Sequence, residues 1–552
     1  MKLAPRSRLV RLSAVLVSIA TAIGLASAGP GELDPTFGGG DGLVVLNGSF
    51  SRASGLAIQA DGRIVVGGGK GNHFALVRLA PDASPDTSFG VNGVVTTDFG
   101  VGGREEILAI AIQPDGRIVA VGSSISSAGR RFAMSRYNAD GTLDPTFDTD
   151  GMVLTDPSGR GGEATAVALS VVGGVLKIVV AGTAFAGGGG TDEDVAVVRY
   201  NANDGGLDAT FNGGKVVAAN SGRREFSAGI AIQSDGKIVV GGNALDPATG
   251  DSNFLLVRFD ESGALDVTFG TPGGGDYAKG GQVTTDFSGA STLADDVLGG
   301  ITIQPDGKIV AGGSTEDENG AAFALARYET NGALDPTLGV GGLVRTPVGS
   351  GAALVMRSDS KILLGGLGSP NRDFTLAQYG ADGSLDATFG AGGVVTTNLG
   401  GFDAIQALAL QADQKIVAGG ITSGVAGTQL AVARYLGGDT TPPTIDSASV
   451  TPSVLWPPNH KFVPVTVAVT ATDDGGPVTC AISEISSSEP VTGPNDDTAP
   501  DWLITGSLTA SLRAERANAA SGRTYAITVE CVDGAGNTAP AEVHVSVSHR
   551  HH

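Results

Sequence analysis

One turn sequence, repeated along the chain, most constrains how this protein can fold. The tetrad Gln-Pro-Asp-Gly at residues 113–116 lies between two apolar runs, 107–112 and 117–121. Proline presets φ at the second turn position, aspartate bonds to its own backbone, and glycine accepts a positive φ. The stretch therefore predicts a strand, a tight turn and a second strand. Similar stretches begin at Leu56, Ile230, Ile301 and Leu408.

The turn, intact or degraded, marks seven repeat units. They are centred at Gln59, Gln113, Ser170, Gln233, Gln304, Arg357 and Gln411. Their average spacing of about 59 residues suits a four-stranded β-propeller blade with generous loops. In a complete unit, a fourth apolar run is followed by a Leu-Asp-x-Thr-Phe loop, as at residues 143–147. The repeat therefore predicts an all-β fold of seven blades.

The two ends of the array complement each other. It begins with a bare Leu-Asp-Pro-Thr-Phe loop at residues 33–37 and a lone strand at 42–46, and it ends at Tyr435 with no Val-rich strand following. A linear solenoid would need capping repeats of different character at both ends. We therefore predict a seven-bladed β-propeller over residues 31–436, closed by its N-terminal strand.

The repeat resembles the delta-60 repeat family, bacterial extracellular repeats expected to form β-propellers. The resemblance covers residues 31–435 and depends on the Gln-Pro-Asp-Gly-Lys-Ile turn (304–309), the Phe-Ala-Leu-Ala-Arg-Tyr strand (323–328) and the Leu-Asp-x-Thr-Phe loop. It implies a secreted or surface location. It supplies no established catalytic residues.

The N-terminus has the features of a secretory signal peptide over residues 1–28. Four basic residues precede an apolar run at 12–25, and Ala26-Ser-Ala28 fits the small-residue cleavage rule. The alternative is a membrane anchor, but the run is short for a bilayer span. After cleavage the 35 basic residues fall to 31 against 57 acidic ones. This excess of negative charge argues against nucleic acid and anionic lipid as partners, and we expect a secreted monomer with no membrane insertion.

Beyond a linker at 437–443, residues 444–548 have a different sequence pattern, without the repeat. Runs at 463–471, 524–531 and 543–547 alternate with period two, which predicts a β-sandwich. The stretches 455–461 and 533–537 resemble bacterial extracellular immunoglobulin-like modules, which commonly serve as spacers or adhesion domains.

The only two cysteines, Cys480 and Cys531, both fall in this C-terminal part. In an exported protein this predicts a disulfide, with a redox or nucleophilic cysteine as the alternative. Two cysteines are too few for a thiolate zinc site. Asp473, Asp474, Asp533 and Asn537 stand at expected strand ends, where they could bind calcium; plain turn formation explains the same residues.

Two features of the propeller could carry chemistry. His73 is its only histidine, and we interpret it as a loop residue ahead of the run 74–78, since no nucleophile turn accompanies it. An arginine ends the fourth run in six units and an aspartate follows in the loop, as in Arg136 and Asp144. Because the pair repeats, we interpret it as a structural bridge within each blade, with the loop phenylalanine packed between blades.

Strands of a meander alternate in direction, so the repeated turns and the Leu-Asp-x-Thr-Phe loops share one face. Loops on the opposite face vary and are acidic, and variable loops on a rigid scaffold often carry recognition. We expect a partner, an extracellular protein or a glycan, to bind there through Asp192, Glu193, Asp194, Asp246, Asp251, Glu316, Asp317 and Glu318.

Two functions remain open. The first is a non-enzymatic secreted or cell-surface binding scaffold. The second is an exported hydrolase or lyase that acts on polysaccharide or peptide through propeller carboxylates. The shortage of histidine, and of any nucleophile that breaks the repeat, favours the first. Carboxylates with shifted pKa values that converge at the mouth of the channel would favour the second.

Overall fold

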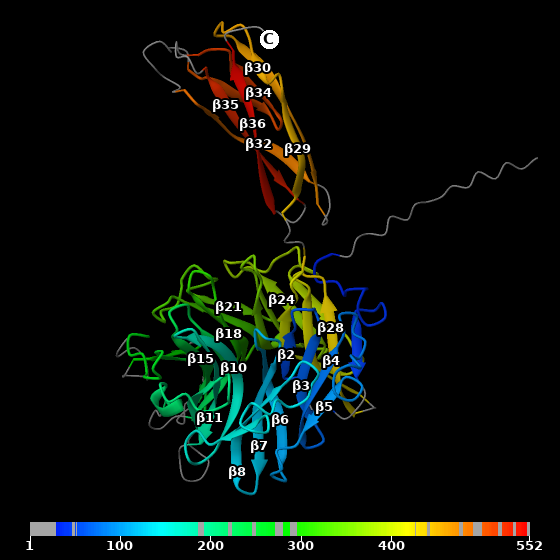
Figure 1. The fold of residues 1–552 in the computed structure, drawn as a ribbon, viewed down its shortest axis with the longest axis vertical. Helices are drawn as coiled ribbons and strands as arrows, with labels where there is room; N and C mark the ends of the chain where they lie inside the picture. The colour runs from blue at the N-terminus through cyan, green and yellow to red at the C-terminus, as the bar shows by residue number, and fades with distance from the viewer. Residues whose placement is uncertain are drawn as a thin grey trace, which may run out of the picture.

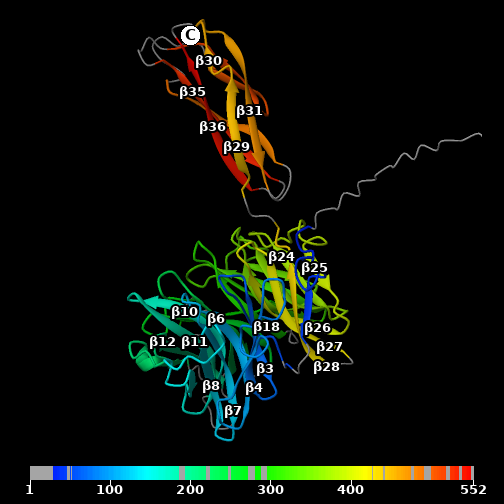
Figure 2. The same cartoon turned by 45° about the vertical axis from the view of Figure 1, so that its right-hand side comes forward.

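A computed structural model describes most of the chain after residue 28. The described residues are 29–46, 50, 52–185, 193–218, 224–245, 250–270, 280–287, 295–424, 427–438, 442–473, 478–489, 499–516, 522–533 and 537–548. The predicted signal peptide lies outside them. Figures 1 and 2 show a broad body of strands, coloured blue to yellow, and a narrower one coloured orange to red. Within the described residues, no helix has the length and apolarity that a bilayer span requires.

The broad body is built from antiparallel units in which each strand pairs with the next along the chain. The units are β2 (Gly55–Ile58), β3 (Ile64–Lys70), β4 (His73–Leu79) and β5 (Val94–Thr97); β6 (Arg104–Ile112), β7 (Ile118–Ser126), β8 (Gly129–Tyr137) and β9 (Met152–Thr155); β10 (Gly162–Val172), β11 (Val175–Phe185), β12 (Glu193–Asn201) and β13 (Lys215–Val217), with a 3-10 turn at Asn212–Gly214; β14 (Arg224–Ile232), β15 (Ile238–Leu245), β16 (Ser252–Phe259) and β17 (Gln282–Thr285); β18 (Asp295–Ile303), β19 (Ile309–Asp317), β20 (Gly320–Tyr328) and β21 (Leu343–Thr346); and β22 (Gly349–Met356), β23 (Ile362–Gly368), β24 (Phe374–Tyr379) and β25 (Val394–Thr397). A single parallel pairing of Ser252 with Asp295 joins β16 to β18.

The predicted turn chemistry is confirmed. Gln113 N donates to Arg117 O at 2.8 Å, Arg117 N donates to Asp115 Oδ1 at 3.1 Å, and Gly116 has a φ of 86°. In the degraded third unit, Gly173 and Gly174, both at positive φ, replace the tetrad between Val172 and Val175. Two such glycines make a tight hairpin turn whose twist matches the flanking strands.

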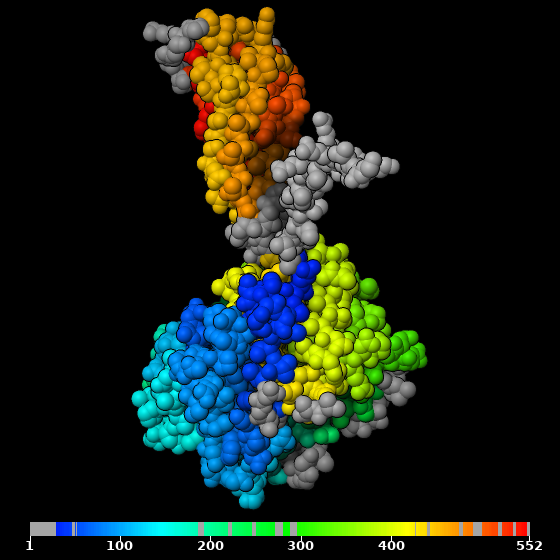
Figure 3. Space-filling model, turned by 90° about the vertical axis from the view of Figure 1, so that its right-hand side faces the viewer, coloured from blue at the N-terminus to red at the C-terminus, as the bar shows by residue number. Residues whose placement is uncertain are grey.

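The first strand completes the last sheet, as predicted. β1 (Leu43–Leu46) pairs with β28 (Gly427–Tyr435), in one sheet with β26 (Phe402–Leu410) and β27 (Ile416–Gly424). Figure 3 shows this N-terminal segment in dark blue, between lighter blue and yellow segments of the broad body. The first strands of the units also form a circuit, since each contacts the next and β26 contacts β2.

The core of this body lies between successive sheets. Phe74 and Phe89 of one unit pack in the same cluster as Ile107, Ile118 and Tyr137 of the next. The Tyr137 hydroxyl lies 2.7 Å from the Thr97 hydroxyl of the preceding unit, and burial raises the pKa of Tyr137 to about 12. Equivalent bonds join Tyr200 to Thr155, Tyr328 to Thr285, Tyr379 to Thr346 and Tyr435 to Thr397.

The C-terminal body has two four-stranded sheets. One contains β29 (Thr444–Thr451), β31 (Phe462–Thr472), β34 (Thr509–Arg513) and β33 (Trp502–Gly506); the other contains β30 (Val454–Leu455), β36 (Thr538–Val547), β35 (Thr524–Val532) and β32 (Thr479–Ser487). Their inner faces share one apolar cluster that includes Val467, Leu512, Tyr525 and Val545. The predicted disulfide between Cys480 and Cys531 is confirmed, and it joins neighbouring strands of one sheet.

Candidate functional site

The loops of the broad body lie on two opposite faces. On the turn face, defined by turns such as 113–117 and loops such as 143–147, Arg117 Nε lies 3.0 Å from Asp144 Oδ2. The opposite face, here called the hairpin face, carries the described tips between second and third strands, such as 126–129 and 317–320. It also carries connections that enter the next unit, such as 98–103. The turns and the Leu-Asp-x-Thr-Phe loops therefore share a face, as predicted.

The recurring arginine and aspartate form joints on the turn face. Arg327 Nε lies 2.6 Å from Asp335 Oδ2, and Arg327 Nη1 donates to Ala381 O of the next unit at 2.5 Å. Five other pairs repeat the contact: Arg78 with Asp86, Arg136 with Asp144, Arg199 with Asp208, Arg258 with Asp266 and Arg434 with Asp34. The guanidinium also lies over the loop phenylalanine, as Arg136 lies 4.3 Å from the ring centre of Phe147. The structural interpretation of this pair is confirmed.

The sixth unit exchanges two members of this joint. In three other units the arginine contacts the glutamine that opens the turn: Arg78 with Gln59, Arg258 with Gln233 and Arg434 with Gln411, at 3.3–3.4 Å. Here Arg357 opens the turn and Gln378 ends the strand, where its Nε2 donates to Asp386 Oδ2 at 2.8 Å. The Arg357 side chain is buried, so the junction keeps a guanidinium that enters from the other strand.

The acidic residues predicted on the hairpin face differ in burial and in ion pairing. Glu193 and Asp194 belong to β12 and are buried, so their prediction as surface contacts was wrong. Glu193 instead forms a two-pronged ion pair with Arg224, at 2.5 and 3.0 Å. Asp317 pairs with Arg345 at 2.6 Å, while Glu316 and Glu318 are exposed and Asp251 is half-buried. Asp192 and Asp246 lie outside the described residues.

A set of buried carboxylates on the innermost strands was missed. Glu105, Asp296 and Asp403 each precede the bulge of a first strand by two residues, and all are at most 2% exposed. Each accepts a hydrogen bond from the loop that enters its strand: Phe99 N at 3.1 Å, Phe287 N at 2.9 Å and Leu399 N at 2.7 Å. These carboxylates fasten the connections of the hairpin face.

Burial raises the pKa of Asp296 to about 6. The negative charges of Asp286 and Asp295 also raise this pKa, whereas the hydrogen bond from Phe287 N lowers it. Ionisation of Asp296 therefore opposes folding, with no penalty below the ordinary value of 3.8 and the full penalty above about 6. We expect Asp296→Asn to increase the free energy of unfolding above pH 6 by up to about 3 kcal/mol, and to change it little at pH 4.

Urea unfolding of wild type and variant between pH 4 and 8 measures this difference. Asp335→Asn is the matched control, because Lys308 and Arg327 hold that carboxylate in its charged form. It should lower stability at neutral pH. An Asp296→Asn variant that is less stable than wild type at pH 8 would contradict the assignment.

In the C-terminal body, Asp533 and Asn537 bind each other. Asn537 N and Nδ2 donate to the two carboxylate oxygens of Asp533, at 2.9 and 2.8 Å. These bonds favour turn formation, the alternative to calcium binding, as the role of these two residues. Asp473 follows β31, and Asp474 lies outside the described residues, so calcium binding there stays a prediction.

Hollows occur on the turn face, between neighbouring units. One of about 720 Å³ is lined by residues that include Gln59, Pro81, Gln411 and Arg434, at the junction that β1 closes. Two others lie between turns of neighbouring units, one lined by Asp235 and Asp306 and the other by Asp306 and Asp382. They are open and repeat with the arginine joints, so they follow from the repeat itself.

A family model described as "Domain of unknown function (DUF5122) beta-propeller" matches six segments of the chain, 59–89, 113–147, 177–211, 233–269, 304–338 and 357–389. The chain is a β-propeller repeat protein. Each segment runs from a turn, or the strand beside it, to the end of a Leu-Asp-x-Thr-Phe loop or of one of its variants at 85–89 and 334–338. These elements form the joints of this repeat protein. No curated protein matches it.

Solved structures similar to this β-propeller repeat protein are distant in sequence. A glucose dehydrogenase is 12% identical with a TM-score of 0.35, covering 59% of this chain and 95% of its own. Drosophila semaphorin 1b, extracellular domains 1-2, is 10% identical with a TM-score of 0.38, covering 73% and 88%. An endo-arabinase from Bacteroides thetaiotaomicron is 10% identical with a TM-score of 0.29, covering 54% and 94%.

Proposed function

We propose that this protein is a secreted or cell-surface, non-enzymatic binding scaffold. In this proposal a seven-bladed propeller of the delta-60 type presents its hairpin face to an extracellular protein or glycan. An immunoglobulin-like sandwich serves as the spacer. The pairing of β1 with β28 and the circuit of first strands support seven blades.

One observation carries the binding role. The ionisable residues that recur are engaged in joints between units, whereas Glu316 and Glu318 are exposed at the hairpin between β19 and β20. The described tips at 70–73 and 126–129 carry no acidic residue. A ligand without sevenfold symmetry requires contacts that differ from blade to blade. Such differences lie on the hairpin face, which supports recognition there.

The carboxylates with raised pKa values give little support to a hydrolase. Glu105 and Asp296 both have raised pKa values, and burial is the main cause of each shift. Both are at most 2% exposed and hold a loop N–H, so a substrate could not reach them without unfolding that loop. A general acid must come within hydrogen-bond reach of its substrate.

The disulfide supports the proposed location. Cys480 and Cys531 are bonded, and structural disulfides form and persist in oxidising compartments such as the cell exterior.

The proposal is tested by screening residues 29–552 on a glycan array and against extracellular proteins, with each hit measured by biolayer interferometry. The double variant Glu316→Lys, Glu318→Lys should weaken binding at least about tenfold, a cost of about 1.4 kcal/mol. Glu261→Lys, an exposed site on the turn face, is the matched control and should bind as wild type does. Equal loss in both variants, or turnover of a polysaccharide or peptide, would overturn the proposal.

A further inference from the structure

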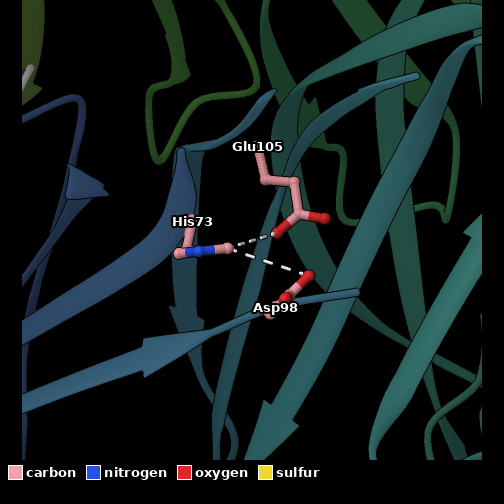
Figure 4. Close-up of side chains that lie close together, drawn as sticks. All are labelled: His73, Asp98 and Glu105. Atoms are coloured by element: carbon pink, nitrogen blue, oxygen red, sulfur yellow. Dashed lines mark ion pairs between the residues drawn. The ribbon is translucent and has the colours of Figure 1, made fainter. Parts of the chain in front are cut away.

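Three side chains that can bind metal meet on the hairpin face, at the junction of the β2–β5 and β6–β9 units (Figure 4). His73 opens β4, Asp98 follows β5, and Glu105 lies on β6. One ligand atom from each lies within 4.8 Å of the others. In the described part of the chain, no other three His, Cys, Asp or Glu side chains meet this closely.

The distances fit a shared ion better than direct bonds. His73 Nδ1 lies 3.6 Å from Glu105 Oε2 and 3.8 Å from Asp98 Oδ1. Both separations are too long for a hydrogen bond. Two atoms that each lie about 2.0–2.2 Å from one tetrahedral zinc ion are about 3.3–3.6 Å apart, so small shifts would bring all three onto one ion.

The imidazole itself points to a ligand. His73 Nδ1 is buried and has no hydrogen-bond partner, although it faces two carboxylates (Figure 4). The His73 side chain as a whole is 42% exposed, so water could complete the coordination of an ion held here. A buried polar atom without a partner is costly to leave unsatisfied.

The histidine also breaks the repeat. The junction between β16 and β18 has equivalent carboxylates, since Asp286 corresponds to Asp98 and Asp296 to Glu105. Phe287 N donates to Asp296 there, as Phe99 N donates to Glu105. The flanking rings agree, since Phe254 and Phe287 lie 5.0 Å apart, as do Phe74 and Phe99. Asn253 stands there in place of His73.

We propose that His73, Asp98 and Glu105 bind a divalent transition-metal ion of the zinc type, with water at the remaining positions. An imidazole nitrogen favours zinc and its neighbours over calcium, which prefers oxygen ligands alone. The ion would tie β4 to the next unit through β6 and the connection 98–103. This site is independent of the binding role proposed above, because its occupancy can be measured without any partner.

The test is a zinc titration of the full chain by calorimetry after treatment with a chelator. The C-terminal histidines His549, His551 and His552 are replaced by serine in every protein, since they could bind zinc on their own. The reference protein should bind one zinc per chain. His73→Gln and Asp98→Asn should each weaken binding at least tenfold.

Asp98→Asn should fold normally, because Asn398 occupies the equivalent position and accepts from Gly400 N at 2.7 Å, as Asp98 accepts from Gly100 N. Asp286→Asn is the matched control and should leave zinc binding unchanged. Asn253→His should create a second site and raise the stoichiometry to two. The absorption spectrum of bound cobalt should change in His73→Gln and in no control.

Three results would overturn the proposal. The first is a reference protein that binds no zinc. The second is zinc binding that His73→Gln and Asp98→Asn leave unchanged. The third is calcium bound more tightly than zinc, with the same dependence on Asp98, which would show that the site selects calcium.

Discussion

Deletion of residues 29–46 is expected to abolish the cooperative unfolding transition of the propeller. The deletion removes β1, the only partner of β28 on that side, together with the loop that carries Asp34 and Phe37. Phe37 is fully buried, and losing a buried phenylalanine costs about 3–5 kcal/mol. Arg434 would stay buried without Asp34, at a further cost of about 3–5 kcal/mol. Together these costs approach the roughly 5–15 kcal/mol that stabilises a typical domain.

Calorimetry and circular dichroism of the deleted protein measure this effect. Removal of residues 442–552 is the control, because it takes away the sandwich and leaves every propeller strand in place. The control should keep the propeller transition. A protein without residues 29–46 that melts cooperatively within a few degrees of the full chain would show that β1 is dispensable.

Arg523→Met is expected to destabilise the C-terminal sandwich by about 3–5 kcal/mol. The Arg523 side chain is 1% exposed, and its guanidinium lies 2.6 Å from Asp501 Oδ2, 3.0 Å from Glu515 Oε1 and 3.3 Å from Glu489 Oε2. Methionine fills much of the same volume without the charge, so buried carboxylates would remain uncompensated. The loss should appear as a lower denaturant midpoint for the sandwich transition alone.

The cause can be separated from lost packing. If unpaired charge is responsible, adding Asp501→Asn and Glu515→Gln to Arg523→Met should recover much of the stability, because the cluster then holds fewer uncompensated charges. A triple variant that is no more stable than Arg523→Met would attribute the loss to packing instead.

Much of the propeller could be predicted because its signals are local. The Gln-Pro-Asp-Gly turn fixes the hairpin through its own backbone preferences, and alternating apolar residues fix which side of each strand is buried. The loop at Leu33 leads into a strand that belongs to no complete unit, and the last unit lacks its fourth strand. The pairing of β1 with β28 could therefore be predicted from the number of strands in each unit. The Arg–Asp joints followed because they repeat in nearly every unit.

The buried carboxylates could not be predicted in the same way. Glu105, Asp296 and Asp403 stand beside loops in the sequence, where acidic residues are usually solvated. Their burial depends on a backbone N–H that the incoming connection supplies after the sheets have packed. Glu193 and Asp194 were misplaced for a related reason, because β12 begins at Glu193 and takes both into the sheet.

The closure also determines how the propeller would respond to mechanical load. β1 and β28 are antiparallel, and Gly31 N donates to Leu436 O at 2.7 Å, so the chain enters and leaves the ring at one place. Tension between Gly29 and Gly438 would peel these strands apart one hydrogen bond at a time rather than shear them together. The Asp34–Arg434 ion pair lies at the start of that path, so it would be among the first contacts to bear the force.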